Sequence, residues 1–411
     1  MRWKPWLRRK HMLDSATLAS LAATHARSTP FYVFDEDAVI SRVRTLQGKL
    51  PPNAGLCFAI KANPFLLPAL KDLDILFEVC SPGELSICED YGVPPQKIVF
   101  SGVCKTRQDI DRAVALGVKT VTLESPLHCD MLLDSLQASG KTQEVIVRLT
   151  SACQFGMSKE DVVSCVKKIA ASPLATLRGI HFFTGTQKKF SKVEKETAEI
   201  QAFCDTLKAQ TGVDFPCIEY GAGLAYDYFS SGKGEPYEDF DRLCGCLKDT
   251  CYEWTIELGR FIAAPCGTYV TTIMDSKRDG ENRYLIVDGG IHHIQYYGQM
   301  MGMKLPPVTH LRVAKSPSND SAYIPARSEQ TEAAYTVCGS LCTLSDVILR
   351  SIKLSAPQIG DLLVFSDIGA YSVTEGIYLL LSHPLPRIFM YSQNAGLREV
   401  RGAFETYTLN H

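Results

Sequence analysis

Lys61 is the first residue whose type and place could support chemistry. It ends an apolar run, residues 56–61, with the length and composition of a buried strand. A lysine at the end of such a strand is partly withdrawn from water, which favours the neutral amine that attacks carbonyl carbons. The same pattern is typical of a lysine that simply leaves a strand into solvent, so Lys61 alone does not decide between the two.

Two later segments could hold an anionic group and an aromatic nitrogen. The small Gly-Ala-Gly residues at 221–223 would let backbone N–H groups approach a phosphate. In residues 257–260, Glu257 could hold a ring nitrogen in its protonated form, while Arg260 could bind a phosphate through two hydrogen bonds. A glycine-rich turn and a surface Glu/Arg pair are the simpler interpretations of the same residues.

Two further candidates lie in the last part of the chain. Cys342, within residues 339–346, could act as an acid that protonates a carbanion. Tyr371 follows residues 367–370 and could offer its hydroxyl to a phosphate. Another buried cysteine and a half-buried core tyrosine are the simpler alternatives here.

The first two thirds of the chain alternate between short apolar runs and longer helix-forming stretches. The runs are residues 56–61, 75–80, 97–101, 119–123, 144–150, 177–182, 216–220 and 253–258. Each is rich in β-branched or aromatic residues, and the stretches between them, such as 105–116 and 158–171, carry helix formers. The pattern predicts parallel βα units, and eight strands is the number that closes a β/α barrel. An open, doubly wound sheet stays a possible alternative.

The alternation stops after Arg260. The next strand-like runs, at 268–273, 283–288, 333–338 and 361–365, follow without regular helices and predict a mainly antiparallel β-domain. Residues 304–330 are rich in Pro, Ser and Asn and predict a long excursion. We therefore expect a barrel over residues 31–265, a β-domain over 266–411, and a lead-in over 1–30 that packs with the β-domain.

Composition excludes several classes of protein. The formal net charge of -2 lacks the basic excess of a nucleic-acid-binding domain, and no apolar stretch is long enough to cross a membrane. Fifteen cysteines, an odd number at irregular spacing, favour neither a disulfide framework nor a metal site. We expect most of them to be small buried hydrophobic residues in a reducing, cytoplasmic compartment.

Taken in order, these segments resemble the fold-type III pyridoxal-phosphate (PLP) decarboxylases, the family of diaminopimelate, ornithine and arginine decarboxylases. The resemblance covers about residues 31 to 371 and depends on many short segments in register. They are residues 59–63, 81–85, 154–157, 179–182, 185–187, 257–260 and 288–290, together with Cys342 and residues 369–371. It implies an α/β fold of alanine racemase-like architecture, with a (β/α)8 barrel of TIM type and a second, mainly antiparallel β-domain. It also implies PLP as the cofactor.

The resemblance further implies roles for single residues. Lys61 carries the cofactor and Glu257 faces its pyridine nitrogen. Cys342 reaches the site from a partner subunit as the catalytic acid, so a homodimer with shared active sites is expected. The other residues expected around the cofactor are Arg148, Phe183, Gly221, Gly223, Gly259, Arg260 and Tyr371.

The chain departs from the family pattern at positions that bear on the substrate. Phe183 stands where the family usually places a histidine over the cofactor ring, so stacking is kept while a titrating group is lost. Thr343 replaces the glutamate with which diaminopimelate enzymes recognise the far end of their substrate. Glu78 and Leu258 are smaller departures. We therefore expect Thr343 and Asp346 to contact a different substrate. The segments involved resemble a branch that acts on carrier-tethered amino acids or on siderophore and antibiotic intermediates.

The predicted reaction is the PLP-dependent decarboxylation of an amino acid or amino-acid conjugate to an amine and CO2. One alternative is a decarboxylase of a free diamino acid such as ornithine, lysine or diaminopimelate. A second is an amino-acid racemase, in which a tyrosine would act as second base where this chain offers Cys342. A third is a catalytically inactive homologue that binds other proteins, although Lys61, Glu257, Arg260 and Cys342 are all retained.

Overall fold

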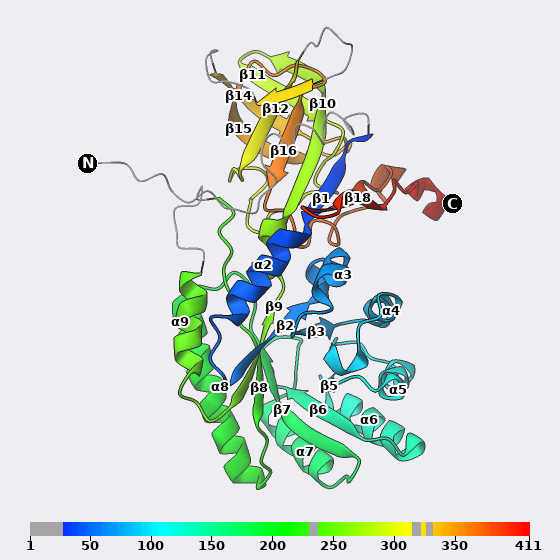
Figure 1. Cartoon of the computed structure of the whole chain (residues 1–411), viewed down its shortest axis with the longest axis vertical. Helices are drawn as coiled ribbons and strands as arrows, with labels where there is room; N and C mark the ends of the chain where they lie inside the picture. Colours follow the sequence, from blue (N-terminus) through cyan, green and yellow to red (C-terminus); the bar gives the residue numbers. More distant parts are fainter. Residues whose placement is uncertain (1–27, 230–236, 315–321, 326–331) are drawn as a thin grey trace, which may run out of the picture. The chain divides into compact units, whose positions relative to one another are not determined.

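The structure is a computed structural model that describes residues 28–229, 237–314, 322–325 and 332–411. It divides into two compact units (Figure 1). The barrel unit takes the described residues of 42–262 other than 227–229. The sheet unit takes residues 28–41, residues 227–229 and the described residues of 263–411.

Eight parallel strands close the barrel of the barrel unit. They are β2 (Ala54–Ala59), β3 (Leu76–Val79), β4 (Ile98–Phe100), β5 (Thr120–Leu123), β6 (Gln143–Arg148), β7 (Ala175–Phe183), β8 (Cys217–Gly221) and β9 (Glu253–Leu258). Each strand pairs with the next, and β9 pairs with β2. The closed ring confirms the predicted (β/α)8 barrel and excludes the open sheet.

Helices connect the barrel strands and cover the outside of the barrel (Figure 1). They are α3 (Leu67–Leu70), α4 (Pro82–Asp90), α5 (Arg107–Leu116), α6 (Pro126–Ser139), α7 (Lys159–Ala170), α8 (Phe190–Thr211) and α9 (Glu238–Leu247). Local signals set their boundaries: Ser81 and Ser125 cap α4 and α6 by accepting backbone N–H groups. Thr106 and Asp109 form a capping box at the start of α5, and Gly117 ends that helix in the left-handed conformation.

The sheet unit is built on ten strands. They are β1 (Phe31–Asp35), β10 (Gly267–Asp279), β11 (Asn282–Val287), β12 (Val308–Ala314), β13 (Ala322–Pro325), β14 (Glu332–Cys338), β15 (Val347–Ser355), β16 (Leu362–Ser366), β17 (Arg387–Ser392) and β18 (Gly396–Arg401). All pairs are antiparallel except β1 with β17 and β11 with β14, which confirms the prediction of a mainly antiparallel domain. Apolar side chains from β1, β10, β12, β16 and β17, among them Val33, Val270 and Val364, form a buried core.

The boundary between the units differs from the one that the sequence predicts. Residues 31–35 were expected to open the barrel, but β1 pairs with β10 and β17 in the sheet unit. All five of its residues are buried, as expected of a strand inside a covered sheet. Of the predicted lead-in at 1–30, residues 1–27 lie outside the described residues, while the Thr29 hydroxyl donates to Asp288 at 2.6 Å. The predicted excursion at 304–330 contains β12 and β13.

Helix α2 (Glu36–Gln47) follows β1 directly.

Among the described residues, no helix has the length and apolar character needed to span a membrane. All fifteen cysteines are described and all are free thiols.

Candidate active site

Lys61 lies where the sequence predicted it, just past the carboxyl end of β2 in the 3-10 turn Ile60–Ala62. Its Nζ donates a hydrogen bond to Glu78 Oε2 at 2.8 Å and lies 3.5 Å from Glu257 Oε1. The Cys80 Sγ atom is 3.6 Å away. Because the carboxyl ends of barrel strands are where barrel active sites form, this amine between two carboxyl groups marks the candidate site.

Glu78 and Glu257 are both buried, yet their charge states differ. Burial raises the pKa of Glu78, and the nearby charge of Glu257 raises it further. Burial also opposes ionisation of Glu257, but Lys61, a hydrogen bond with Glu78 and Arg148 outweigh it, so the pKa of Glu257 lies below its usual range. Of the two, Glu78 is therefore the more readily protonated, and Glu257 the more readily ionised.

His181, on β7, supports Glu257 from the side. Its Nε2 lies 3.2 Å from Glu257 Oε2. Burial, together with the charge of Arg148, lowers the pKa of His181 to about 3, so the ring is neutral. The Nε2–H tautomer is the one that can donate to the carboxylate of Glu257. His181 received no predicted role from the sequence, although it lies in one of the segments of the family resemblance.

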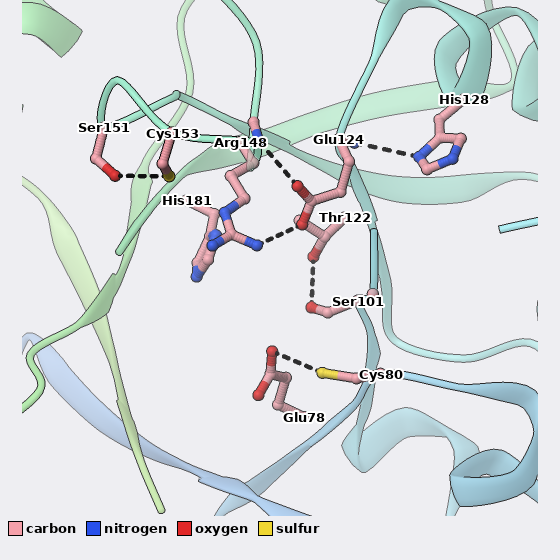
Figure 2. A network of polar contacts seen from close by, with 12 residues as sticks. Glu78, Cys80, Ser101, Thr122, Glu124, His128, Arg148, Ser151, Cys153 and His181 are labelled. Atoms are coloured by element: carbon pink, nitrogen blue, oxygen red, sulfur yellow. Dashed lines mark hydrogen bonds and ion pairs between the residues drawn. The ribbon is translucent and has the colours of Figure 1, made fainter. Parts of the chain in front are cut away.

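Arg148 ends β6 and is held by Glu124 (Figure 2). Its Nη1 donates to Glu124 Oε1 at 2.5 Å, and the other oxygen of Glu124 accepts the Gly156 N–H at 3.0 Å. The guanidinium carbon of Arg148 lies 6.0 Å from the ring centroid of Phe183. Both side chains of the ion pair are buried, so this pair fixes a positive charge at the carboxyl end of the barrel.

At the end of β8 and in the turn that follows it, two positions have room only for glycine. A Cβ on Gly221 would lie 2.4 Å from Cδ2 of Phe183, and one on Gly223, whose φ is +56°, would lie 2.0 Å from the Gly185 carbonyl oxygen. The Lys188 Nζ donates to the Gly221 carbonyl at 3.2 Å and pairs with Glu196 at 2.6 Å. The backbone here carries no side chains at Gly221 and Gly223 and is held in place by Lys188, as a phosphate-binding turn requires.

The predicted cofactor residues of the barrel unit come together at one end of the barrel. Lys61, Arg148, Phe183, Gly221, Gly223 and Glu257 lie at the carboxyl ends of β2, β6, β7, β8 and β9, and Gly259 and Arg260 follow β9 directly. Arg260 is buried and begins the short helix α10 (Arg260–Ala263). These residues therefore lie together at the carboxyl end of the barrel, as a shared cofactor site would require.

The remaining predicted residues belong to the sheet unit. Cys342 and Thr343 are exposed, and Tyr371 is half-buried with a φ of +69°. Asp346 is buried and accepts the backbone N–H groups of Ile291 at 2.9 Å and Leu341 at 2.8 Å. These bonds give Asp346 a structural part in its turn. The contacts of Asp346 and Thr343 with a substrate stay predictions, as does the contact of Tyr371 with the cofactor phosphate.

Another buried glutamate near Glu257, Glu219, was not singled out from the sequence. Atoms of Glu219, on β8, His181 and Glu257 lie within 4.8 Å of one another, a spacing that a metal ion could use. However, His181 already contacts Glu257, and the Lys61 ammonium lies 3.5 Å from the Glu257 carboxylate, where it would repel a cation. The sequence offers little signal for Glu219, because all five residues of β8 are buried and the strand shows no regular apolar-polar alternation.

Comparison with known proteins gives the same picture. Residues 36–264 match the family model described as the pyridoxal-dependent decarboxylase, pyridoxal binding domain. An L-glutamyl-[BtrI acyl-carrier protein] decarboxylase of Niallia circulans is 26% identical, with 91% of each chain covered. A 2-[(L-alanin-3-ylcarbamoyl)methyl]-2-hydroxybutanedioate decarboxylase of Staphylococcus aureus is 26% identical, with 88% of this chain and 94% of the relative covered. The solved diaminopimelate decarboxylase of Helicobacter pylori shares the fold, with a TM-score of 0.80, 21% identity and 95% and 98% coverage of the two chains.

Proposed function

This chain belongs to the pyridoxal-dependent decarboxylases, and we propose that it acts on an amino acid attached to a carrier protein or to a larger conjugate. Its cofactor is PLP, and its reaction removes an amino-acid carboxyl group as CO2. The observation that carries the reaction type is the Lys61 amine held between Glu78, whose pKa is raised, and Glu257, whose pKa is lowered. A nucleophilic amine beside an anion for a ring nitrogen is the pair that PLP chemistry needs.

The described residues fit the cofactor. Lys61 would bind it covalently and Glu257 would hold a proton on its pyridine nitrogen. The bare turn at Gly221 and Gly223, together with Arg260, would bind the phosphate. When bound, PLP supplies a conjugated ring that accepts the electron pair left behind by the departing CO2.

The chain's own residues control charge around that ring. Glu257, whose pKa is lowered, would keep the proton on the pyridine nitrogen in place. The neutral His181 orients the carboxylate of Glu257. Phe183 offers an aromatic face where the family usually places a histidine. Cys342 or Lys61 would deliver a proton to the carbon that loses CO2, with Cys342 contributed by a second copy of the chain.

The substrate proposal has two supports. The two relatives described above act, by their names, on a glutamyl carrier protein and on a hydroxybutanedioate conjugate. In this chain the exposed segment 342–345 carries no charged side chain. A free diamino acid has a charged far end that calls for a charged partner, whereas a tethered or amide-linked substrate does not.

We also propose a homodimer with shared active sites in the cytoplasm, in a secondary-metabolite pathway. The dimer follows from the role assigned to Cys342. The compartment is supported by fifteen free thiols, many of them buried.

The test is CO2 release from a panel of substrates. The panel holds free lysine, ornithine, arginine, diaminopimelate and glutamate, together with glutamyl-carrier protein and citryl-linked amino acids. We expect release from a conjugated substrate and none from Lys61→Arg, which keeps the charge but cannot bind the cofactor covalently. Release from a free diamino acid alone would overturn the substrate proposal and leave the reaction type intact.

A further inference from the structure

Lys188 is a buried lysine to which the proposed function gives no role. It lies in the short loop between β7 and α8 and is 5% exposed. Removing an ammonium group from water costs free energy unless the group is paired and hydrogen-bonded. The contacts that Lys188 makes therefore indicate its role.

Glu196, on α8, is the anion that pairs with Lys188. Its Oε2 accepts hydrogen bonds from Lys188 Nζ at 2.6 Å and from the Tyr220 hydroxyl at 2.7 Å, and its Oε1 accepts one from the Thr184 hydroxyl. Burial opposes ionisation of Glu196, but these hydrogen bonds outweigh it, so the pKa of Glu196 lies below its usual range. Burial lowers the pKa of Lys188, and the hydrogen bond and charge of Glu196 oppose that effect. The pair is therefore attached to the ends of β7 and β8 through Thr184 and Tyr220.

Lys188 also binds the carbonyl groups of both glycines in the proposed phosphate turn. Its Nζ donates to the Gly221 carbonyl at 3.2 Å, and its backbone N–H donates to the Gly223 carbonyl at 3.0 Å. The Cε of Lys188 would lie 2.8 Å from a Cβ on Gly223, so the lysine side chain packs directly against the turn. Both carbonyl groups therefore point toward Lys188.

The direction of these carbonyl groups decides what the other side of the turn presents. The peptide units of the turn are trans, and in a trans unit the C=O and N–H point in opposite directions. The Leu224 N–H shares its peptide unit with the Gly223 carbonyl and is therefore directed away from Lys188. Backbone N–H groups attract a phosphate, whereas carbonyl oxygens repel it. Lys188 thus keeps the repelling groups on its own side of the turn.

The loop that carries Lys188 is itself held to the segment after the turn. The Gln187 side chain donates to the Tyr226 carbonyl at 2.9 Å and accepts the Tyr226 N–H at 2.5 Å. The backbone of Gln187 has a φ of +53°, a conformation that persists only where surrounding contacts hold it. A turn that is held in this way loses little conformational freedom when an anion binds, which favours high affinity.

We propose that the Lys188–Glu196 pair positions the backbone of the turn for the PLP phosphate and thereby sets the affinity of the chain for PLP. The inference rests on the proposed place of the phosphate at Gly221 and Gly223 and deepens it. Lys188 acts through the Gly221 and Gly223 carbonyls, so it is a positioning residue. Its effect should therefore fall on the phosphate alone.

The first test compares PLP with pyridoxal, which carries the same aldehyde but no phosphate. The full chain is stripped of cofactor, and its affinity for each compound is measured by absorbance. Lys188→Met should lower the affinity for PLP about 10-fold or more and leave the affinity for pyridoxal unchanged. An equal loss of affinity for both compounds would overturn the proposal, because the damage would not be specific to the phosphate.

Lys105→Met is the matched control for this test. Lys105 is another buried lysine of the barrel unit, and its Nζ donates to the Thr122 backbone carbonyl at 2.8 Å. Its replacement should lower stability while the ratio of PLP affinity to pyridoxal affinity stays at the wild-type value. A fall of that ratio as large as in Lys188→Met would show that any buried lysine has the same effect, and would overturn the proposal.

A double variant separates positioning from stability. Lys188→Met leaves the Glu196 carboxylate buried without its cation, so it should lower the denaturation midpoint. Adding Glu196→Gln removes the unpaired charge and should recover much of that midpoint. The affinity for PLP should stay as low as in Lys188→Met, because the Gly221 carbonyl still lacks its donor. Recovery of PLP affinity together with stability would overturn the positioning role.

Gly223→Ala distinguishes failure of this inference from failure of the proposed phosphate site. If Gly223→Ala weakens PLP binding and Lys188→Met does not, the turn binds the phosphate and Lys188 has no part in it. If neither variant changes the ratio of PLP affinity to pyridoxal affinity, the phosphate binds elsewhere, and the proposed site and the role of Lys188 are both wrong. These outcomes do not depend on which substrate is decarboxylated.

Discussion

Two neighbouring positions inside the barrel place the same residue type in opposite charge states. Glu257 lies at the carboxyl end, where Lys61, Arg148 and a hydrogen bond from Glu78 hold its pKa down. Glu219 lies two residues closer to the amino end in the strand register, where burial without a hydrogen-bond partner among the described residues raises its pKa. Surroundings, and not residue type, thus assign the anion to one glutamate and the acid to the other.

The largest expected effect comes from the centre of the carboxyl end. Lys61→Arg should lower kcat/KM by at least about 1000-fold, because it removes the nucleophile while keeping a positive charge beside Glu257. The lysine-linked cofactor absorbance should disappear as well. CO2 release and the absorbance spectrum measure the two effects. If Lys61→Arg kept both its CO2 release and the cofactor absorbance, Lys61 would have no part in the mechanism.

The two ends of the barrel also differ in how strongly their ion pairs are buried. Arg148→Met leaves Glu124 buried without its cation, so the free energy of unfolding should fall by about 3–5 kcal/mol. Arg178→Met breaks a partly exposed pair with Glu253 at the other end and should cost about 0–1 kcal/mol. Urea unfolding of the two variants measures both values, and equal losses would contradict the contrast.

The phosphate turn is expected to respond less. Gly223→Ala adds a Cβ 2.0 Å from the Gly185 carbonyl at a positive φ, and should cost about 1–3 kcal/mol of stability while weakening PLP binding. Gly212→Ala is the matched control, since its φ of +71° is similar but nothing lies within 4 Å of the added carbon. It should cost about 1–2 kcal/mol, with PLP affinity unchanged. Equal PLP affinity in both variants would show that the turn at Gly223 does not bind the cofactor.

The smallest expected effect is the pH dependence of stability, to which Glu219 and Glu257 contribute with opposite signs. The raised pKa of Glu219 means that its contribution to stability is full below the unfolded value of about 4.3 and is lost as pH rises toward the folded value. The lowered pKa of Glu257 means that its contribution is present above about 4.3 and is lost as pH falls through the folded value.

Stability curves of the apoprotein against pH should therefore change in opposite directions. Relative to wild type, Glu219→Gln should gain stability as pH rises above about 4.3, and Glu257→Gln should lose less stability on acidification below that value. Denaturant unfolding at a series of pH values measures both slopes. Changes of the same sign would show that the two carboxyl groups share one charge state.

Much of the barrel follows from the sequence, because eight apolar runs separated by helix formers have few other ways to pack. Residues at strand ends, such as Lys61 and Glu257, could be placed for the same reason. The interior residues Glu219 and His181 could not, since strands buried on both faces give no apolar-polar alternation to show which side chains point inward. The place of β1 also needed the structure, because its pairing with β10 and β17 joins segments far apart in the chain.

Lys61 is the residue expected to bind the cofactor, and the proposed reaction depends on that bond. The most direct measurement is borohydride reduction of the PLP-loaded protein followed by peptide mass spectrometry, which locks the lysine–cofactor bond wherever it forms. The barrel unit offers buried rivals, since burial lowers the pKa of Lys105 to about 8 and also lowers that of Lys188. A pyridoxyl label on the peptide that contains Lys61, and its loss in Lys61→Arg, is the predicted result. A label on Lys105 or Lys188 would contradict the assignment of the site.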